Sequence, residues 1–189
     1  MNYKELFHKI LGLLSAPGKA WEEICTENER NNILTGFVYP LIGVCGLAEF
    51  AGTFIERGIS PDVFQYALQS CCAVAVALFG GFFLASYLLE RMGKRWFGLS
   101  CSRERMQAFT GYSMVVLFVL DTICPFFPIA ILRWLLQLYT LFIVFEGARR
   151  YLDIKETKLT SYTLVATILI LLSPALIEFI FNKLSVILN

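Results

Sequence analysis

The sequence is poor in charged residues and in histidine. Charged residues make up 16% of its 189 residues and hydrophobic residues 57%, and the one histidine is His8. Soluble domains carry about 25% charged residues, so a soluble fold is disfavoured. A zinc site of the usual ligands and intramembrane zinc proteolysis need a second histidine, which this sequence lacks. An intramembrane serine–histidine pair is excluded because His8 lies outside the long apolar runs.

Motifs for other chemistry are missing as well. The cysteines are Cys25, Cys45, Cys71, Cys72, Cys101 and Cys124. They form no C-x-x-C pair, and no phosphate-binding loop or dinucleotide fingerprint occurs. We expect free, packed thiols, no metal, no cofactor and no catalytic residue. Because 16 basic residues nearly balance 15 acidic ones, no net field favours nucleic acid as a partner.

Long apolar runs account for most of the chain. A helix rises about 1.5 Å per residue, so about 20 apolar residues cross a hydrocarbon layer of about 30 Å. The 43-residue run from Met106 to Ala148 is too long for one crossing and is expected to fold back at Pro125 to Pro128. The predicted spans are 33–54, 63–89, 106–124, 129–148 and 161–181. The predicted fold class is therefore all-α, a polytopic membrane bundle of five transmembrane helices.

Residues 1–32 are expected to form short helices next to the transmembrane domain, 33–189. One apolar stripe at helical spacing comprises Tyr3, Leu6, Phe7, Ile10, Leu13 and Leu14. A helix with this stripe either lies in the membrane interface or packs under the bundle. Pro17 and Gly18 begin a second short helix, which is expected to place Trp21 at headgroup depth, where indole is favoured.

Basic residues gather on one side of the predicted membrane. Thirteen of the 16 lie in the N-terminal region and in the loops after the second and fourth spans. These are Lys4, Lys9, Lys19, Arg30, Arg91, Lys94, Arg95, Arg103, Arg105, Arg149, Arg150, Lys155 and Lys158, against Arg57, Arg133 and Lys183 on the other side. The positive-inside rule then predicts a cytosolic N-terminus and an external C-terminus.

Five of these basic residues directly follow a span and are expected at the membrane interface. They are Arg91, Lys94, Arg95, Arg149 and Arg150. Basic groups near an anionic membrane surface are attracted to it, so anionic lipids are the expected partners on the cytosolic face. Topology determination alone also explains most of these charges. Glu146 is expected to pair with Arg149 or Arg150.

Small residues recur at every fourth position of the second span. They are Ala73, Ala77, Gly81 and Ala85. Such a face lets another helix backbone approach closely. It is interpreted either as a seam between two copies of the chain or as a helix contact within one chain, and the contact within one chain is favoured.

Three acidic residues share one depth in the membrane. Glu49, Asp121 and Glu178 lie roughly 23 to 26 Å from the cytosolic entry of their spans. An acid exposed to lipid at depth costs up to about 3 kcal/mol, so each is expected to avoid acyl chains. Arg133 is the basic residue near that level. One interpretation is a structural pair of Asp121 with Arg133, and the other is an outward-open polar cavity that collects a cation or a lipid headgroup.

Short motifs spread along the chain resemble one known family. They are Pro17, Gly18 and Trp21 before the first span, Gly111-Tyr112 in the third, and Leu138-Tyr139 and Glu146-Gly147 in the fourth. In this pattern the chain resembles the Yip-type domain, a family of five-span membrane proteins best known in eukaryotes as Rab-interacting factors of vesicle traffic. The resemblance implies a short prokaryotic-type member in the bacterial plasma membrane.

Two functions from different classes are consistent with these observations. The resemblance implies a non-enzymatic membrane-organising or trafficking-type adaptor. The intramembrane carboxylates suggest an alternative, a transporter or channel for a small solute, an ion or a lipid.

Overall fold

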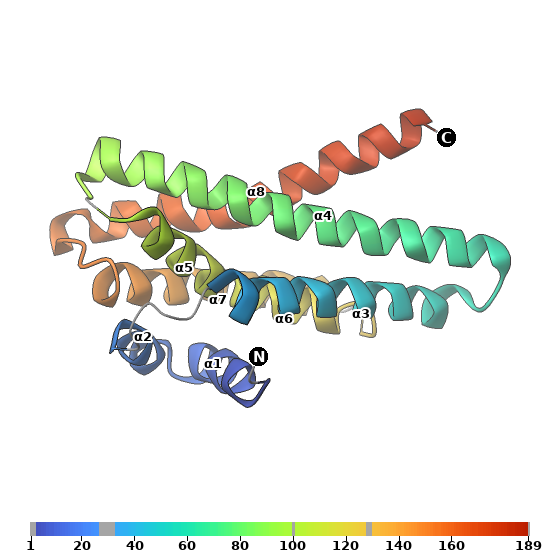
Figure 1. Ribbon diagram of the computed structural model, residues 1–189, viewed down its shortest axis with the longest axis horizontal. Coiled ribbons are helices and arrows are strands. Elements are labelled where there is room, and N and C mark those ends of the chain that lie inside the picture. The colour runs from blue at the N-terminus through green and yellow to red at the C-terminus, as the bar shows by residue number, and fades with distance from the viewer. Residues whose placement is uncertain (1–2, 27–32, 100, 128–129, 189) are drawn as a thin grey trace.

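The computed structural model arranges long helices side by side, with two short helices on one flank (Figure 1). It describes residues 3–26, 33–99, 101–127 and 130–188, and all regular structure within these ranges is helical. The helices are α1 (Tyr3–Ser15), α2 (Pro17–Thr26), α3 (Tyr39–Arg57), α4 (Pro61–Met92), α5 (Arg103–Ser113), α6 (Val115–Ile123), α7 (Ala130–Arg150) and α8 (Glu156–Leu188), with π-helical turns η1 (Leu34–Val38) and η2 (Gly93–Phe97). The predicted all-α class is confirmed for this part of the chain.

Four segments are long and apolar enough to cross a membrane. They are Leu34–Arg57, Pro61–Phe97, Arg103–Ile123 and Glu156–Leu184. They overlap the first, second, third and fifth predicted spans. The search of the described residues does not include α7, which has 21 residues, among the four. Residue 129 of the fourth predicted span, Pro128 of the predicted turn and Arg30 lie outside the described residues.

Hydroxyl caps explain where two of the helices begin. The Ser60 side chain accepts a hydrogen bond from the Val63 backbone nitrogen at 3.4 Å, and Pro61 occupies the first turn of α4. Ser102 accepts from the Arg105 backbone nitrogen at 3.2 Å and caps α5 in the same way. Such caps satisfy amides that the first turn of a helix leaves unpaired.

Two long helical segments are less regular than expected. The third predicted span is interrupted at Met114, whose ψ of 0° separates α5 from α6. Pro174 lies inside α8, where it removes a backbone donor and crowds the preceding turn. In Figure 1 the C-terminal part of α8 runs away from α4. No residue in the sequence predicts the interruption at Met114, whereas Pro174 itself predicts an irregularity in α8.

The connections after α4 and after α7 lie at the same end of the bundle, opposite the turn between α3 and α4 (Figure 1). α4 packs against both α3 and α8, and α2 packs against α7. Large side chains that are fully buried in this core include Trp21, Phe37, Phe109, Phe118 and Tyr162. The N-terminal helices therefore belong to the packed structure of the chain.

Candidate functional site

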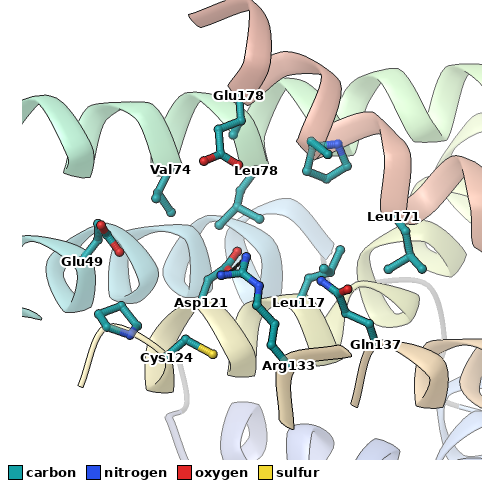
Figure 2. A pocket seen from close by; sticks show the side chains of 14 residues that line it. Glu49, Val74, Leu78, Leu117, Asp121, Cys124, Arg133, Gln137, Leu171 and Glu178 are labelled. Carbon is teal, nitrogen blue, oxygen red and sulfur yellow. Dashed lines mark hydrogen bonds and ion pairs between the residues drawn. The ribbon is translucent and has the colours of Figure 1, made fainter. Parts of the chain in front are cut away.

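A cavity of about 410 Å³ lies between α3, α4, α6, α7 and α8. Figure 2 shows it from close by. Its lining residues are Glu49, Val74, Ala77, Leu78, Leu117, Asp121, Cys124, Pro125, Arg133, Gln137, Leu171, Pro174, Ala175 and Glu178. All four residues of the candidate polar cluster are among them. The structure thus brings together four side chains that the sequence related only by their depth. We call this space the Asp121 cavity.

One ion pair joins the last turns of α6 to the start of α7. Arg133 Nη2 donates to Asp121 Oδ1 at 3.0 Å, and the two side chains are 46% and 15% exposed. The pair closes across the turn that begins at Pro125, because that turn directs α7 back along α6. The carboxylate of Asp121 is thereby neutralised within the chain.

The other two acids of the Asp121 cavity are less constrained. Glu49 on α3 is half-buried and Glu178 on α8 is exposed. In Figure 2 they lie on different sides of the Asp121–Arg133 pair. Among the described residues, neither has a basic group within ion-pair distance. The cavity therefore presents two carboxylates beyond the single neutralised pair.

Close helix contacts frame the Asp121 cavity. A Cβ added at Gly81 would lie 2.6 Å from Pro174 Cα, so α4 and α8 touch backbone to backbone just where α8 contains its proline. A Cβ at Gly52 would overlap Pro125 at the turn after α6. Beyond Pro174, Ala175 and Glu178 line the open space. The cavity therefore lies between two glycine–proline contacts.

The stripe of small residues on α4 is buried within one chain. Ala73, Ala77, Gly81 and Ala85 have small exposed areas, and Gly81 faces α8. In this structure the stripe serves a contact between helices of the same chain. Within the described residues no group of three or more His, Cys, Asp or Glu side chains is arranged to hold a metal ion.

Trp21 organises the opposite end of the bundle. Its indole is fully buried, and Nε1 donates to the backbone oxygen of Ile143 at 3.0 Å. Its ring lies 5.7 Å from that of Phe109 and 5.3 Å from that of Tyr151, measured between centroids. A Cβ at Gly147 would come within 2.6 Å of the indole. We call this cluster the Trp21 junction.

That Trp21 lies at headgroup depth stays a prediction, and the structure adds that its indole is buried within the protein. Protein encloses the indole on all sides because α2 packs directly on α7. The exposed tryptophans are Trp96 and Trp134, at 63% and 74%. The preference of indole for the membrane interface holds for exposed side chains, and it gives no information once a tryptophan is packed against another helix.

A charged cluster borders the Trp21 junction. Arg150 Nε donates to Glu146 Oε2 at 2.6 Å, and Arg150 also pairs with Glu22 of α2. The Arg150 guanidinium donates to both carboxylates, and its charge is permanent because guanidinium groups stay protonated in proteins. A Cβ at Gly18 would lie about 3.0 to 3.1 Å from this Arg150–Glu146 pair. The Pro17-Gly18-Trp21 motif thus packs directly on the Glu146-Gly147 motif.

Sequence reasoning placed Glu146 with Arg149 or Arg150, and the structure selects Arg150. Arg149 instead lies 3.8 Å from Glu156 in an exposed pair. The residue pattern does not single out Glu22, which directly follows Trp21 and also pairs with Arg150. The spacing of four between Glu146 and Arg150 was the available signal, because such residues share one helix face.

The basic residues after α4 are exposed. Arg91 Nε donates to Tyr87 Oη at 3.2 Å, and Lys94 Nζ lies 2.6 Å from Glu90 Oε1. Arg95 is exposed at the same helix end. They lie at the end of the bundle that carries the connections after α4 and α7 (Figure 1).

These observations define a class of protein, a multipass integral membrane protein built as a helical bundle. Residues 11–177 match the model of the Yip1 domain. The match covers most of the chain, including the Trp21 junction and every residue that lines the Asp121 cavity except Glu178, so the chain belongs to the Yip1 domain family. The resemblance noted from the motifs is confirmed. No curated protein and no solved structure matches the chain.

Proposed function

We propose that this Yip1-family protein is a non-enzymatic membrane-organising adaptor that acts at the cytosolic face of the membrane. The observation that carries the proposal is the Trp21 junction. It fixes two short amphipathic helices to the basic end of the bundle by buried aromatic contacts and a three-residue charge cluster. Helices attached this rigidly present a fixed binding surface to a partner or a membrane. Such a role requires no catalytic residue.

The proposed topology has five spans, with α7 as the fourth. Its 21 residues reach about 30 Å, the thickness of the hydrocarbon layer. The one-sided distribution of basic residues supports a cytosolic N-terminus and an external C-terminus in a bacterial plasma membrane. Reporter fusions are expected to place Arg95 and Lys155 in the cytosol and Arg57 and Asn189 outside. An external Arg95 would reverse the assignment.

α1 is the proposed interfacial element. Its Leu6, Ile10 and Leu14 pack against the core, while Tyr3 and Phe7 are 73% and 62% exposed. Tyr139 Oη donates to the Leu14 backbone oxygen at 2.9 Å and ties α1 to α7. The apolar stripe therefore supports both interpretations, because one part packs on the bundle and another part is free to enter the headgroup layer.

A second candidate function rests on the Asp121 cavity. Its volume of about 410 Å³ and its two unpaired carboxylates suit a small cationic solute or a headgroup amine. Under this alternative the protein moves such a solute through the bundle. The transporter function requires measurable flux of a solute across the membrane, whereas the adaptor function does not.

Reconstitution of the purified protein in liposomes separates the two functions. For the adaptor we expect anionic lipids to be enriched among the lipids that copurify, and no flux of sodium ions, protons or small amines above that of empty vesicles. Carboxylate-dependent flux that the substitution Glu49→Gln abolishes would overturn the adaptor in favour of the transporter. Random lipid composition would remove the support for action at an anionic surface.

A further inference from the structure

A second open space lies at the basic end of the bundle, between the end of α4, η2 and α8. It is a groove of about 690 Å³. Its lining residues are Leu88, Arg91, Met92, Lys94, Arg95, Trp96, Val165 and Leu169. Five of the eight side chains are apolar and three are basic. The groove is remote from the Asp121 cavity, with which it shares no lining residue.

The helix geometry sorts these residues into two lines. Leu88, Met92 and Trp96 are spaced by four and lie along one face, and Arg91 and Arg95 have the same spacing beside them. The chain stays helical through η2 and leaves the helix at Gly98, whose φ of 68° suits glycine. An apolar line thus runs next to a basic one.

Exposure differs along the groove. Met92 is buried and forms the floor, while Leu88 together with Val165 and Leu169 of α8 is half-buried and forms the walls. Trp96 is 63% exposed. An apolar channel with a tryptophan and basic groups at its end matches the layering of a membrane leaflet, where acyl chains give way to headgroups.

The charge of the groove is positive. Lys94 is paired with Glu90, which leaves the two guanidinium groups as the net charge of the rim. Arg91 donates to the neutral Tyr87 hydroxyl and lies over its ring, and within the described residues neither Arg91 nor Arg95 makes an ion pair. Guanidinium groups bind phosphate oxygens through paired hydrogen bonds, so the rim complements a phosphodiester.

We infer that this groove binds one anionic phospholipid, with its phosphate at Arg91 and Arg95 and one acyl chain along Leu88, Val165 and Leu169. The inference rests on the proposed function, because it takes this end of the bundle to face the cytosolic leaflet. It names the site through which that face engages anionic lipid. The acyl chain of a neutral phospholipid would also fit the apolar walls of the groove. Its headgroup carries no net negative charge to balance the two guanidinium groups.

Tryptophan fluorescence of the full chain in vesicles tests the site. Trp134→Phe removes an exposed indole on α7, and the indole of Trp21 is enclosed by protein, so Trp96 becomes the reporter. Vesicles of phosphatidylcholine receive equal small fractions of phosphatidylglycerol or phosphatidylcholine with brominated acyl chains, which quench indole on contact. We expect stronger quenching by the brominated phosphatidylglycerol.

Two pairs of substitutions separate the groove from general surface charge. Arg91→Gln with Arg95→Gln is expected to reduce the preference for phosphatidylglycerol by about fivefold per residue. The control pair, Lys155→Gln with Lys158→Gln, removes equal charge from exposed positions outside the groove and is expected to keep the preference. Equal loss in both pairs would overturn the groove and leave general attraction of anionic lipid intact.

Filling the groove tests its apolar part. Val165→Phe with Leu169→Phe keeps every charge and is expected to lower quenching by both brominated lipids. If this pair does not fold, Leu169→Phe alone serves, because its side chain is half-buried at the surface. Unchanged quenching in a folded filled variant would overturn the acyl site. Absence of any preference for phosphatidylglycerol in the parent would overturn both the groove and the lipid-directed adaptor.

Discussion

The Trp21 junction and the Asp121 cavity are built from overlapping sets of helices but are packed in opposite ways. At the junction, glycines let an indole lie directly on a helix backbone, and the aromatic side chains around it are buried. At the cavity, glycines contact prolines, α8 departs from α4, and about 410 Å³ stays open. The close packing around Trp21 provides a rigid attachment, and the open space beside Asp121 is large enough for a ligand.

The difference follows from which residue faces the glycine. Opposite Gly147 stands a flat ring that fills the space completely, so the contact excludes further atoms. Opposite Gly81 stands Pro174, which brings the helices close at one point and bends one of them away beyond it. Small residues therefore do not by themselves predict tight packing over a whole helix face.

The largest effect is expected from removing the indole of the Trp21 junction. Trp21→Ala leaves a cavity and removes the hydrogen bond from the indole to the Ile143 carbonyl, so the free energy of unfolding should fall by about 3–5 kcal/mol. Titration of the purified protein from mild detergent into denaturing detergent measures this change. The matched control is Trp134→Ala, whose exposed side chain should matter by less than about 0.5 kcal/mol. Comparable losses in the two variants would contradict the role of the junction.

A smaller loss is expected at the contact between α4 and α8. Gly81→Leu forces the backbones apart at Pro174, and we expect a loss of about 2–3 kcal/mol in the same titration. Gly43→Leu is the control, because a Cβ at Gly43 meets no atom within 4 Å. An unchanged free energy of unfolding for Gly81→Leu would mean that the small stripe does not hold these helices together.

The charge cluster at the Trp21 junction should contribute less than the indole. Glu146→Gln removes the negative charge of one partner of Arg150 and leaves that guanidinium with Glu22 as its carboxylate partner, so the melting temperature should fall by about 2–4 °C. Glu156→Gln breaks the exposed pair with Arg149 and should shift it little. Equal shifts would show that burial at the junction adds nothing to the pair.

The smallest effects are expected at the Asp121 cavity. Asp121→Asn loses the pair with Arg133 and should cost about 0.5–1 kcal/mol, whereas Glu49→Gln removes an unpaired charge and should cost nothing. Thermal shift with added monovalent and divalent cations completes the test. A cation-dependent shift in the parent that Glu49→Gln abolishes would favour a ligand site, and its absence would leave the structural pair as the sole role of these acids.

Part of this structure could be predicted from residue patterns. Run length and charge placement predicted five helical spans; within the described residues all five are helical, and four are long and apolar enough to cross a membrane. The shared depth of Glu49, Asp121 and Glu178 anticipated that they line one cavity, because depth in a bundle limits which side chains can meet. The Met114 break escaped prediction, since no proline or glycine marks it.

Other features depend on how helices distant in sequence pack together. From the sequence alone, Trp21 looks the same as a tryptophan exposed at the membrane interface. Its indole is buried because α7 approaches it closely at Gly147. The sequence likewise does not predict that Leu88 and Trp96 line one groove with Val165, because these residues lie on α4, η2 and α8. The sequence by itself determined an apolar, one-sidedly charged helical chain suited to a membrane, because hydropathy and charge act locally. Which faces meet, and where space stays open, was decided by the tertiary structure, because contact between helices depends on the shapes of both surfaces.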